Sequence, residues 1–530
     1  MNNRRVNILV PLLLALIVIL GLQIGFMLTP LMTKPSLFGN EKLSPQEQVM
    51  QLVRANYVDT VSLDGETIED MVSRLDPHTA YIAPSEQSYV HEMLSGNFGG
   101  VGIEFFSIRD TIWVLDVVAD GPAAKAGMRK GDKILSVNDT AVAGQSLDDT
   151  YIFTRLRGVA GTRVHLTALD RNNVVKKVTI TRGAIPSPSI DAAYMIDHQT
   201  GFIRLSRFSG TSYTEFVAAM KDLKAQGLQR LILDLRGNGG GLLDEATAIA
   251  DEFIDQGKLL VYTKGRVYGK EEFKSRVAGV FEQGPLEVLI DENSASASEV
   301  IAGALQDYDR ALLIGRRTFG KGLVQQQYKL NNGGFLRLTV AKYYTPSGRS
   351  IQKPYAEGNE KYYHEVYERN DDSAVQYADT TPYFTAGGRL VYASGGIQPD
   401  IEVTDTTTAG ARFDGFIIGI SRLQEVAFDY AAANFDSLRS LYATAEDFIR
   451  GYDVPDALVE KLARELRGGK ARFRNPAYEA AATLRLKAFI GRYVFDRNVL
   501  HRMLNEEDLV YKRAVREISD PKFAYVRTSP

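Results

Sequence analysis

The stretch PLEVLIDENSASASEVIAGALQDYDR, residues 285–310, decides the fold class because it predicts a buried strand that leads directly into a helix. PLEVLI is a short apolar run, and Val300, Ile301, Ala304 and Leu305 then recur at the three- and four-residue steps of a helix with one apolar face. Strands and amphipathic helices alternate in the same way over residues 186–403. This alternation predicts an α/β layered domain.

Three serines, Ser294, Ser296 and Ser298, lie where this strand meets the helix. A serine just before a helix usually caps it, which would account for Ser298 and for Ser294 but not for all three. The amides at a helix N-terminus can also stabilise the oxyanion that forms when a serine attacks a carbonyl carbon. The joint is therefore a candidate site for a nucleophilic serine.

A nucleophilic serine needs a base, and histidine is the usual one. The six histidines are His78, His91, His165, His198, His364 and His501. None lies within residues 230–350, where the strands and loops expected to form the site are found. A Ser-His-Asp triad built from a distant histidine remains open, because triads are defined by geometry rather than by sequence spacing.

Lys321, in the stretch GRRTFGKGLVQQQ of residues 315–327, is the other candidate base. Phe319 and Leu323 supply apolar cover, and Gly320 and Gly322 allow close approach of the backbone. A lysine held in a partly desolvated site has a lowered pKa and can accept a serine proton near neutral pH.

The same stretch has the glycine and lysine spacing of a phosphate-binding P-loop, but the rest of that motif is missing. Gly322 stands where a P-loop has Ser or Thr, and the runs LVQQQYKL, NNGG and FLRLTVAKYY predict a hairpin rather than a helix. Nucleotide binding is therefore not expected, and neither is an ATP-driven unfoldase.

The composition is that of an ordinary globular protein. The chain has 530 residues, with 45% hydrophobic and 24% charged side chains. A net charge of −3 and the lack of a basic stripe argue against nucleic acid as a partner. Cysteine is absent, which excludes disulfides, thiol catalysis and cysteine zinc sites but leaves the compartment open.

The N-terminus predicts a membrane anchor within residues 1–30. Arg4 and Arg5 precede ILVPLLLALIVILGLQIGFML, residues 8–28, an uncharged run long enough to span a bilayer. A long cleavable signal peptide is the alternative, since Pro11 and Gln23 interrupt the apolar run. Positive charge stays in the cytoplasm, so one helix in the cytoplasmic membrane would place the catalytic part in the periplasm or outside the cell.

Four further regions follow along the chain. Residues 41–96 predict a small helical region, and residues 97–185 predict a β domain from short runs such as VGIEFFSI and DKILSVND between glycine-rich turns. Residues 186–403 form the α/β core, and residues 404–530 have helical spacing, as in PDALVEKLARELRG. The expected fold class is thus a multidomain α/β (α+β) protein, with the β domain inserted between a helical lead-in and the core.

The β domain carries glycines in a functional pattern. FGGVGIEF, residues 98–105, followed by GPAAKAGMRKGDKILSVND, residues 121–139, resembles the PDZ domain of bacterial envelope proteases. A PDZ domain binds a peptide's C-terminal carboxylate with backbone amides of a glycine-containing loop and adds the tail as an extra strand. The resemblance implies a groove walled by a helix from Asp148 to Leu156. It assigns the tail-binding loop to Gly99, Gly100, Val101, Gly102 and Ile103.

The candidate serine and lysine also belong to a family pattern. SASASE, followed by TFGKGLVQ with its lysine 25 positions after the middle serine, resembles the C-terminal processing peptidases, also called tail-specific proteases. The resemblance covers most of residues 41–403 through LDPHTAYI, LILDLRGNGGGLL, YYTPSGRSIQ and GGIQPDIEV. It implies that Ser296 is the nucleophile, that Lys321 is its general base and that Gln325 holds the lysine, without a metal or an organic cofactor. Period-two alternation would put positions 321 and 325 on one face of a strand.

RGNGGG, residues 236–241, begins like a dinucleotide-binding fingerprint, but Leu242 replaces its third glycine. In the family, one glycine amide of this loop joins the amide after the nucleophile in the oxyanion hole, which implies Gly240 or Gly241 together with Ala297. Glu299, beside the site, is expected to complement the helix dipole rather than to transfer protons.

Two segments depart from compact relatives. Some forty residues, at about 353–394, separate SGRSIQ from GGIQPD, and their charged, tyrosine-rich composition would shield or extend the site. The helical region at 404–530 contains no recognisable motif, so a role in regulation or in a homodimer is left open.

The leading hypothesis is a membrane-anchored serine endopeptidase that uses a Ser/Lys dyad and selects proteins by their C-terminal tails through the PDZ domain. The alternative is a non-catalytic tail-binding scaffold, for which the PDZ domain and the helical region would suffice. Ser296, Lys321 and Gln325 argue against the scaffold, because tail binding alone does not require them.

Overall fold

The computed structural model describes residues 43–520, apart from residues 62, 64, 66, 109–110, 146–148, 370–380, 394, 404–416 and 467–468. The apolar run at residues 8–28, which is predicted to anchor the chain, lies outside the described residues. Within the described residues, none of the helices combines the length and the apolar character that crossing a membrane requires.

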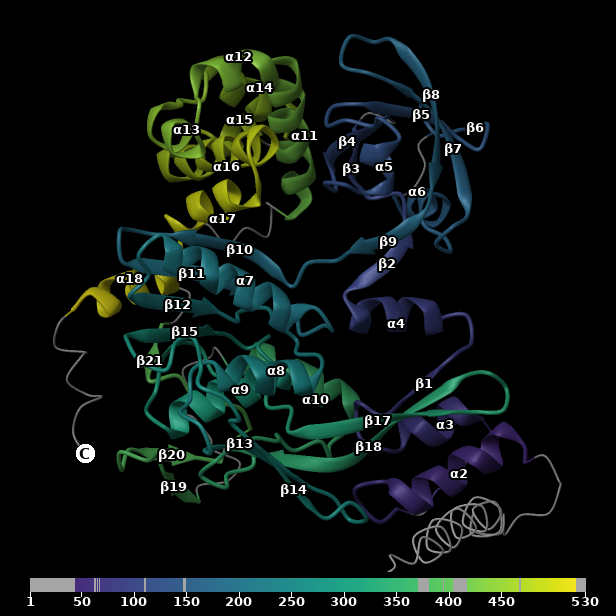
Figure 1. The fold of residues 1–530 in the computed structure, drawn as a ribbon, viewed down its shortest axis with the longest axis vertical. Helices are drawn as coiled ribbons and strands as arrows, with labels where there is room; N and C mark the ends of the chain where they lie inside the picture. The colour runs from purple at the N-terminus through teal and green to yellow at the C-terminus, as the bar shows by residue number, and fades with distance from the viewer. Residues whose placement is uncertain are drawn as a thin grey trace, which may run out of the picture.

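A six-stranded sheet forms the centre of the core, in the order β10-β11-β12-β15-β16-β21 (Figure 1). β10 is antiparallel to β11, and all other neighbouring strands in this sheet are parallel. Helices connect the parallel strands, as expected for an α/β layered domain. The strands are β10 (Ile190–Met195), β11 (Thr200–Leu205), β12 (Arg230–Asp234), β15 (Leu286–Ile290), β16 (Leu312–Gly315) and β21 (Ile401–Glu402).

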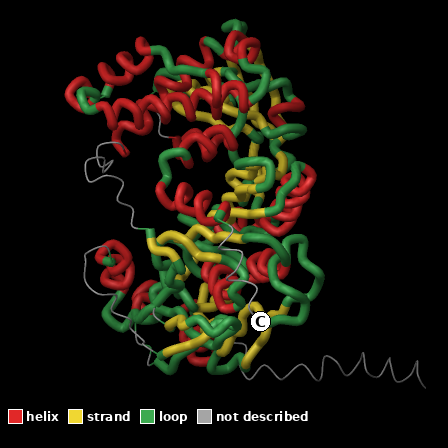
Figure 2. The backbone as a smooth tube through the Cα atoms, turned by 90° about the vertical axis from the view of Figure 1, so that its left-hand side faces the viewer, coloured by secondary structure: helices red, strands yellow, loops and turns green. Residues whose placement is uncertain are grey.

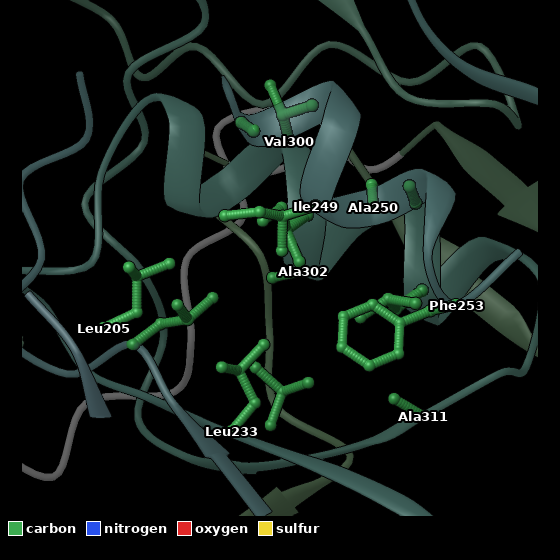
Figure 3. Packing of buried hydrophobic residues seen from close by; sticks show 14 of the residues in the cluster. Leu205, Leu233, Ile249, Ala250, Phe253, Val300, Ala302 and Ala311 are labelled. Atoms are coloured by element: carbon green, nitrogen blue, oxygen red, sulfur yellow. The ribbon is translucent and has the colours of Figure 1, made fainter. Parts of the chain in front are cut away.

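Both faces of this sheet are covered. Leu231 and Leu233 of β12 pack in the cluster that contains α7 (Ser212–Ala225), α8 (Leu243–Asp251) and α9 (Ala297–Asp307). Figure 3 shows Leu233 facing Ile249 and Ala302 of these helices. Ile232, between the two leucines, packs on the opposite face with α18 (Leu509–Ser519). Burial on both faces explains why the central strands are continuous apolar runs.

A second sheet carries the hairpin that follows Lys321. β17 (Leu323–Lys329) and β18 (Phe335–Tyr344) pair in antiparallel fashion around the NNGG turn, so the predicted hairpin is confirmed. β18 also pairs with β1 (Ala80–Ile82) and β13 (Leu259–Lys264), and β13 pairs with β14 (Lys270–Lys274). The N-terminal helices α2 (Pro45–Asn56) and α3 (Ile68–Ser73) pack against β18 through a shared apolar cluster.

The PDZ-like domain leaves and rejoins the core through a two-stranded ribbon of β2 (Asn97–Gly100) and β9 (Gly183–Pro186). Its sheet has the order β3-β4-β5-β7-β8, with β6 beside β5, so β3 is an edge strand. An edge strand is what a bound peptide tail needs as a pairing partner. The elements are β3 (Ile103–Ile108), β4 (Thr111–Val117), α5 (Pro122–Lys125), β5 (Lys133–Val137), β6 (Thr140–Ala141), α6 (Asp149–Leu156), β7 (Arg163–Leu169) and β8 (Val175–Thr181).

The C-terminal helices pack on both the PDZ-like domain and the core, and Figure 2 shows them at the same end of the molecule as the PDZ-like strands. Trp113 of β4 meets Phe428 of α11 with ring centroids 5.5 Å apart, and Asn498 of α17 accepts the backbone N–H of Ala193 at 2.9 Å. They therefore connect the two parts of the chain. They are α11 (Ile417–Ala433), α12 (Phe435–Leu441), α13 (Ala445–Gly451), α14 (Asp456–Glu465), α15 (Gly469–Arg472), α16 (Pro476–Val494) and α17 (Arg497–Asn505).

Candidate active site

Ser296 immediately precedes α9 and has an unusual backbone conformation, with φ of 56° and ψ of −113°. Non-glycine residues rarely occupy this positive-φ region, and strain of this kind concentrates at functional sites. Ser296 is half-buried, whereas Ser294 and Ser298 are fully buried. Of these three serines, Ser296 is the one that a substrate can reach.

The other two serines have structural contacts. Ser298 lies inside α9 rather than before it, so the expectation that it caps the helix is wrong. Its hydroxyl donates to the carbonyl of Asn238 at 2.8 Å, which ties α9 to the RGNGGG loop. The Ser294 hydroxyl donates to the carbonyl of Leu235 at 2.8 Å. Both hydroxyls therefore fix the joint to the segment that follows β12.

Lys321 lies just before β17, and its Nζ donates to Oε1 of Gln325 at 3.2 Å. The Nε2 of Gln325 in turn donates to the carbonyl of His78, which comes from the LDPHTAYI segment. Burial and, to a smaller extent, the nearby charge of Arg337 lower the pKa of Lys321 to about 8, against the opposing charges of Asp76 and Glu299. A lysine with this pKa is partly neutral near pH 7 to 8 and can accept a proton.

Tyr343 of β18 joins the backbones of the serine and the lysine. Its hydroxyl donates to the carbonyl oxygen of Ser296 at 3.0 Å and also lies within hydrogen-bonding distance of the carbonyl of Lys321. The side chain is buried in the core. One buried side chain therefore lies within hydrogen-bonding distance of the backbone carbonyls of both residues.

Glu299 connects the same two segments through its buried carboxylate. Oε2 accepts the backbone N–H of Ser296 at 2.8 Å and that of Lys321 at 2.9 Å. Oε1 accepts the hydroxyl of Thr318 at 2.6 Å and the N–H of Gly320 at 2.7 Å. Burial raises the pKa of Glu299 to about 7, although these four donors oppose the shift. The expected role of complementing the helix dipole is thus incomplete, because Glu299 fixes the lysine loop against the serine.

The RGNGGG loop passes directly beside the serine. A Cβ at Gly240 would lie 2.8 Å from the Cβ of Ser296, so only glycine fits there. The N–H of Gly240 donates to Oδ1 of Asn238 at 2.9 Å. Within the described residues, the N–H groups of Gly241 and Ala297 have no hydrogen-bond partner. These two amides, rather than that of Gly240, are available for an oxyanion.

His78 is a histidine that the fold brings to this site. Its Nε2 lies 2.9 Å from the hydroxyl of Tyr362, and burial together with the charges of Lys321 and Lys353 lowers the pKa of His78 to about 3. LDPHTAYI matches the family pattern, but its sequence does not indicate that His78 lies at this site. The segment is more than two hundred residues away from Lys321 along the chain. Among the described residues, no group of three or more His, Asp or Glu side chains is arranged to hold a metal ion.

The insertion at about 353–394 packs on the lysine loop. Its described elements are α10 (Asn359–Glu368), β19 (Pro382–Phe384) and β20 (Leu390–Tyr392). Tyr362 of α10 is buried and meets the ring of Phe319 at a centroid distance of 5.5 Å. Arg369 donates to the carbonyl of Thr318 at 2.6 Å and to that of Phe319 at 3.0 Å. The insertion therefore adds to the desolvation of the segment that carries Lys321.

The predicted tail-binding loop spans the end of β2 and the start of β3. Gly99 and Gly100 belong to β2, Ile103 begins β3, and Val101 and Gly102 lie between the strands. In the described part of the chain, the N–H groups of Val101 and Gly102 have no hydrogen-bond partner, although both residues are buried. Two free and adjacent amides beside an edge strand are what a bound carboxylate would use.

Beside this loop, α6 stands against the edge strand and forms an apolar wall. The rings of Phe105 of β3 and Phe153 of α6 have centroids 5.0 Å apart. Phe153 is 44% exposed, so part of this apolar surface remains open to a ligand. The structure thus places an apolar wall next to the two free amides.

An α/β core that holds a strained serine at a helix N-terminus, next to a lysine of lowered pKa, has the arrangement of a serine-type peptidase. Comparison with known families agrees. The model of peptidase family S41 matches residues 199–361, and that of a PDZ domain matches residues 113–169. A family of unknown function (DUF8443) matches residues 418–496 in the C-terminal helices.

Two relatives of this chain agree with the family assignment. A carboxy-terminal-processing protease from Bartonella bacilliformis is 38% identical over 315 residues, covering 57% of this chain and 71% of that protein. A probable CtpA-like serine protease from Staphylococcus aureus is 35% identical over 314 residues, covering 58% of this chain and 62% of that protein. A solved photosystem II D1 C-terminal processing protease is 26% identical, with a TM-score of 0.38, over 69% of this chain and 94% of that chain. The chain belongs to the S41 family of carboxy-terminal-processing proteases, with a PDZ domain.

Proposed function

We propose that this chain is a serine endopeptidase in which Ser296 is the nucleophile and Lys321 is the general base, acting on proteins selected by their C-terminal tails. The observation that carries the proposal is the double attachment of the two residues, through Glu299 and through Tyr343, combined with the lowered pKa of Lys321. Gln325 orients the lysine side chain and links it to the carbonyl of His78.

The reaction follows from these positions. The Ser296 hydroxyl loses its proton to the neutral Nζ of Lys321 while its oxygen attacks the carbonyl carbon of the scissile peptide bond. The lysine then gives this proton to the leaving amine, and an acyl-enzyme remains on Ser296. Water attacks the ester, with Lys321 accepting a proton from the water and returning it to the serine. Each half-reaction restores the neutral lysine.

The oxyanion of each tetrahedral intermediate is assigned to the N–H groups of Ala297 and Gly241. Both are free in the described structure, whereas that of Gly240 is bound to Asn238. A Cβ at Gly241 would lie 2.0 Å from the carbonyl oxygen of Phe208, so this amide is held in place by close backbone packing. Fixed donors of this kind need no reorganisation during the reaction.

Substrate selection is assigned to the PDZ domain. The tail would pair with the free edge of β3, its carboxylate would meet the amides of Val101 and Gly102, and its last side chain would lie against the apolar wall of Phe105 and Phe153. We also infer that residues 8–28 anchor the chain in the cytoplasmic membrane, with the catalytic part in the periplasm or outside the cell; the support is the length of the uncharged run and the preceding arginines.

The test compares the full chain with its Ser296→Ala variant on a library of unfolded proteins and peptides that end either in a free carboxylate or in an amide. We expect cleavage by the unsubstituted protein alone, faster for the free acids, with products identified by mass spectrometry. Equal cleavage by the Ser296→Ala variant would overturn the assignment of the nucleophile. Tail binding without any cleavage would favour the non-catalytic scaffold.

A further inference from the structure

A carboxylate of the chain itself lies at the tail-binding loop. Oε1 of Glu92, on α4 (Gln87–Ser95), accepts the backbone N–H of Gly99 at 3.4 Å. Oε2 of the same side chain pairs with Nη1 of Arg157 at 3.2 Å. Arg157 directly follows α6, so the end of the groove helix and the loop share this one carboxylate.

Arg157 is positioned as a receptor for a carboxylate. Its guanidinium lies over the ring of Phe98, 4.3 Å from the centroid, and 5.3 Å from that of Phe153. The Nε of Arg157 is buried and has no hydrogen-bond partner in the described structure. Glu92 therefore does not bind the Nε donor of Arg157. The N–H groups of Val101 and Gly102 also have no acceptor in the described structure. A carboxylate that reaches all of these donors would bind more favourably than Glu92 does.

The helix that carries Glu92 is not fixed by a core of its own. None of the residues of α4 is buried, and its apolar side chains Tyr89 and Met93 are 58% and 51% exposed. Its C-terminal end is attached to the core by the carbonyl of Leu94, which accepts the N–H of Gly210 at 2.9 Å. Figure 1 shows α4 between the PDZ domain and the β17–β18 hairpin. A helix without buried side chains can move away from the loop at a small cost in free energy.

We propose that Glu92 is an internal ligand of the tail-binding site and that the C-terminal carboxylate of a substrate displaces it from Gly99 and Arg157. This inference rests on the proposed selection of substrates by their tails. It identifies Arg157 as a residue that recognises the tail carboxylate. The side chain of Glu92 then competes with the peptide carboxylate for Arg157 and for the N–H of Gly99. An amidated or internal peptide segment gains nothing from Arg157 and does not displace Glu92.

The test measures binding in the full chain with Ser296→Ala, so that cleavage does not interfere. The probe is a fluorescent decapeptide that ends in Gly-Ile-Val, prepared as the free acid and as the C-terminal amide. Glu92→Gln keeps the size of the side chain but removes its charge, so the free acid should bind on the order of 3- to 10-fold more tightly, as expected when a partly exposed ion pair no longer competes. Binding of the amide should not change.

Two further variants make the result specific. Arg157→Gln should narrow the difference in affinity between the free acid and the amide to the part that the N–H groups of Val101 and Gly102 supply, and Glu92→Gln should have a much smaller effect in that background. Glu86→Gln is the charge-matched control, because Glu86 precedes the same helix and, among the described hydrogen bonds, its side chain accepts only the local N–H of Ala83. It should leave both affinities unchanged.

Each contrary result has its own meaning. If the free acid binds more tightly than the amide but Glu92→Gln does not increase its affinity, Glu92 is not a competitor and the inference is wrong. The inference is also wrong if Glu92→Gln strengthens the binding of the amide as much as that of the acid, because Glu92 then blocks the groove by its size. Equal affinities for acid and amide in every variant would overturn tail selection itself.

Discussion

Glu299 accepts the backbone N–H of Lys321 at 2.9 Å with the same oxygen that accepts the N–H of Ser296 at 2.8 Å. The first turn of α9 and the loop before β17 are therefore joined by a single buried carboxylate. Burying such a group is unfavourable unless donors surround it, and here four donors do so. The position of Lys321 relative to Ser296 thus depends on a residue that takes no part in bond breaking.

The first prediction concerns Glu299→Gln. The new NH2 group would face either the N–H groups of Ser296 and Lys321 or the N–H of Gly320 and the hydroxyl of Thr318, so at least one backbone N–H loses its acceptor, at a cost of about 1–3 kcal/mol for each buried donor left unsatisfied. We expect a lower melting temperature and a cleavage rate reduced on the order of 10²-fold, because a small misplacement of the reacting groups is enough for such a loss. Thermal unfolding and peptide cleavage measure the two effects, and the exposed Glu69→Gln is the control. An unchanged rate at normal stability would show that Glu299 does not position the lysine.

The second prediction is the dependence of the cleavage rate on pH. Lys321 must be neutral to accept the serine proton, and its pKa is lowered to about 8 by burial. The lysine is protonated below this pH, so the rate constant kcat/KM should rise with pH up to about 8 and then level off. A rate that is already at its maximum at pH 6 would be incompatible with a lysine base.

The third prediction uses Gln325 to move that pH profile. Gln325→Glu replaces a neutral partner of the lysine with a carboxylate of nearly the same shape. An adjacent negative charge favours the ammonium form, so the pKa of Lys321 should rise and the pH profile should shift to higher pH. Gln325→Ala is the comparison, since it removes the contact without adding charge and should lower the rate with a smaller shift. If the pH profile of Gln325→Glu does not shift, residue 325 does not influence the group whose titration controls the rate.

The fourth prediction tests the insertion. Tyr362→Ala would remove a buried ring from above Phe319 and admit water to the lysine loop. Because burial is the largest cause of the lowered pKa of Lys321, the pH profile should again shift upward and the rate at pH 7 should fall. Lys361→Ala, on the exposed side of the same helix, is the control. If both variants keep the original profile, the insertion has another role than covering the lysine.

The sequence predicted the local structure of the site well because that structure depends on local patterns. The buried strand that leads into α9 and the hairpin after Lys321 follow from hydrophobic periodicity and from the NNGG turn. The joint also indicated a serine at a helix N-terminus. The expectation for Ser298 failed because the helix begins at Ala297, two residues earlier than a cap at Ser298 would require, and such boundaries are weakly encoded.

The contacts that depend on tertiary structure could not be predicted from the sequence. Glu299 meets its partners in a loop some twenty positions away, and Gln325 meets the carbonyl of His78 across 247 positions. No period or spacing reports which residues will share a buried carboxylate. The contact of Glu92 with Arg157 is similar, since it forms only when α4 packs beside the PDZ loop. The anchor, the compartment and a homodimer remain predictions of the sequence alone.

The last prediction separates a Ser/Lys dyad from a histidine triad, because the structure places His78 beside Gln325, the hydrogen-bond partner of Lys321. Lys321→Ala should reduce cleavage on the order of 10²- to 10⁴-fold, the usual value of general base catalysis. Lys321→Arg should lose cleavage activity as well, because a guanidinium stays protonated at any working pH and cannot accept the serine proton. His78→Gln should retain activity within about 10-fold, since the contact with Gln325 uses the backbone carbonyl of His78 and the buried ring is already paired with Tyr362. The three variants are compared by kcat/KM, with circular dichroism as the check on folding. Full activity of Lys321→Arg together with an inactive His78→Gln would make His78 the base and overturn the dyad.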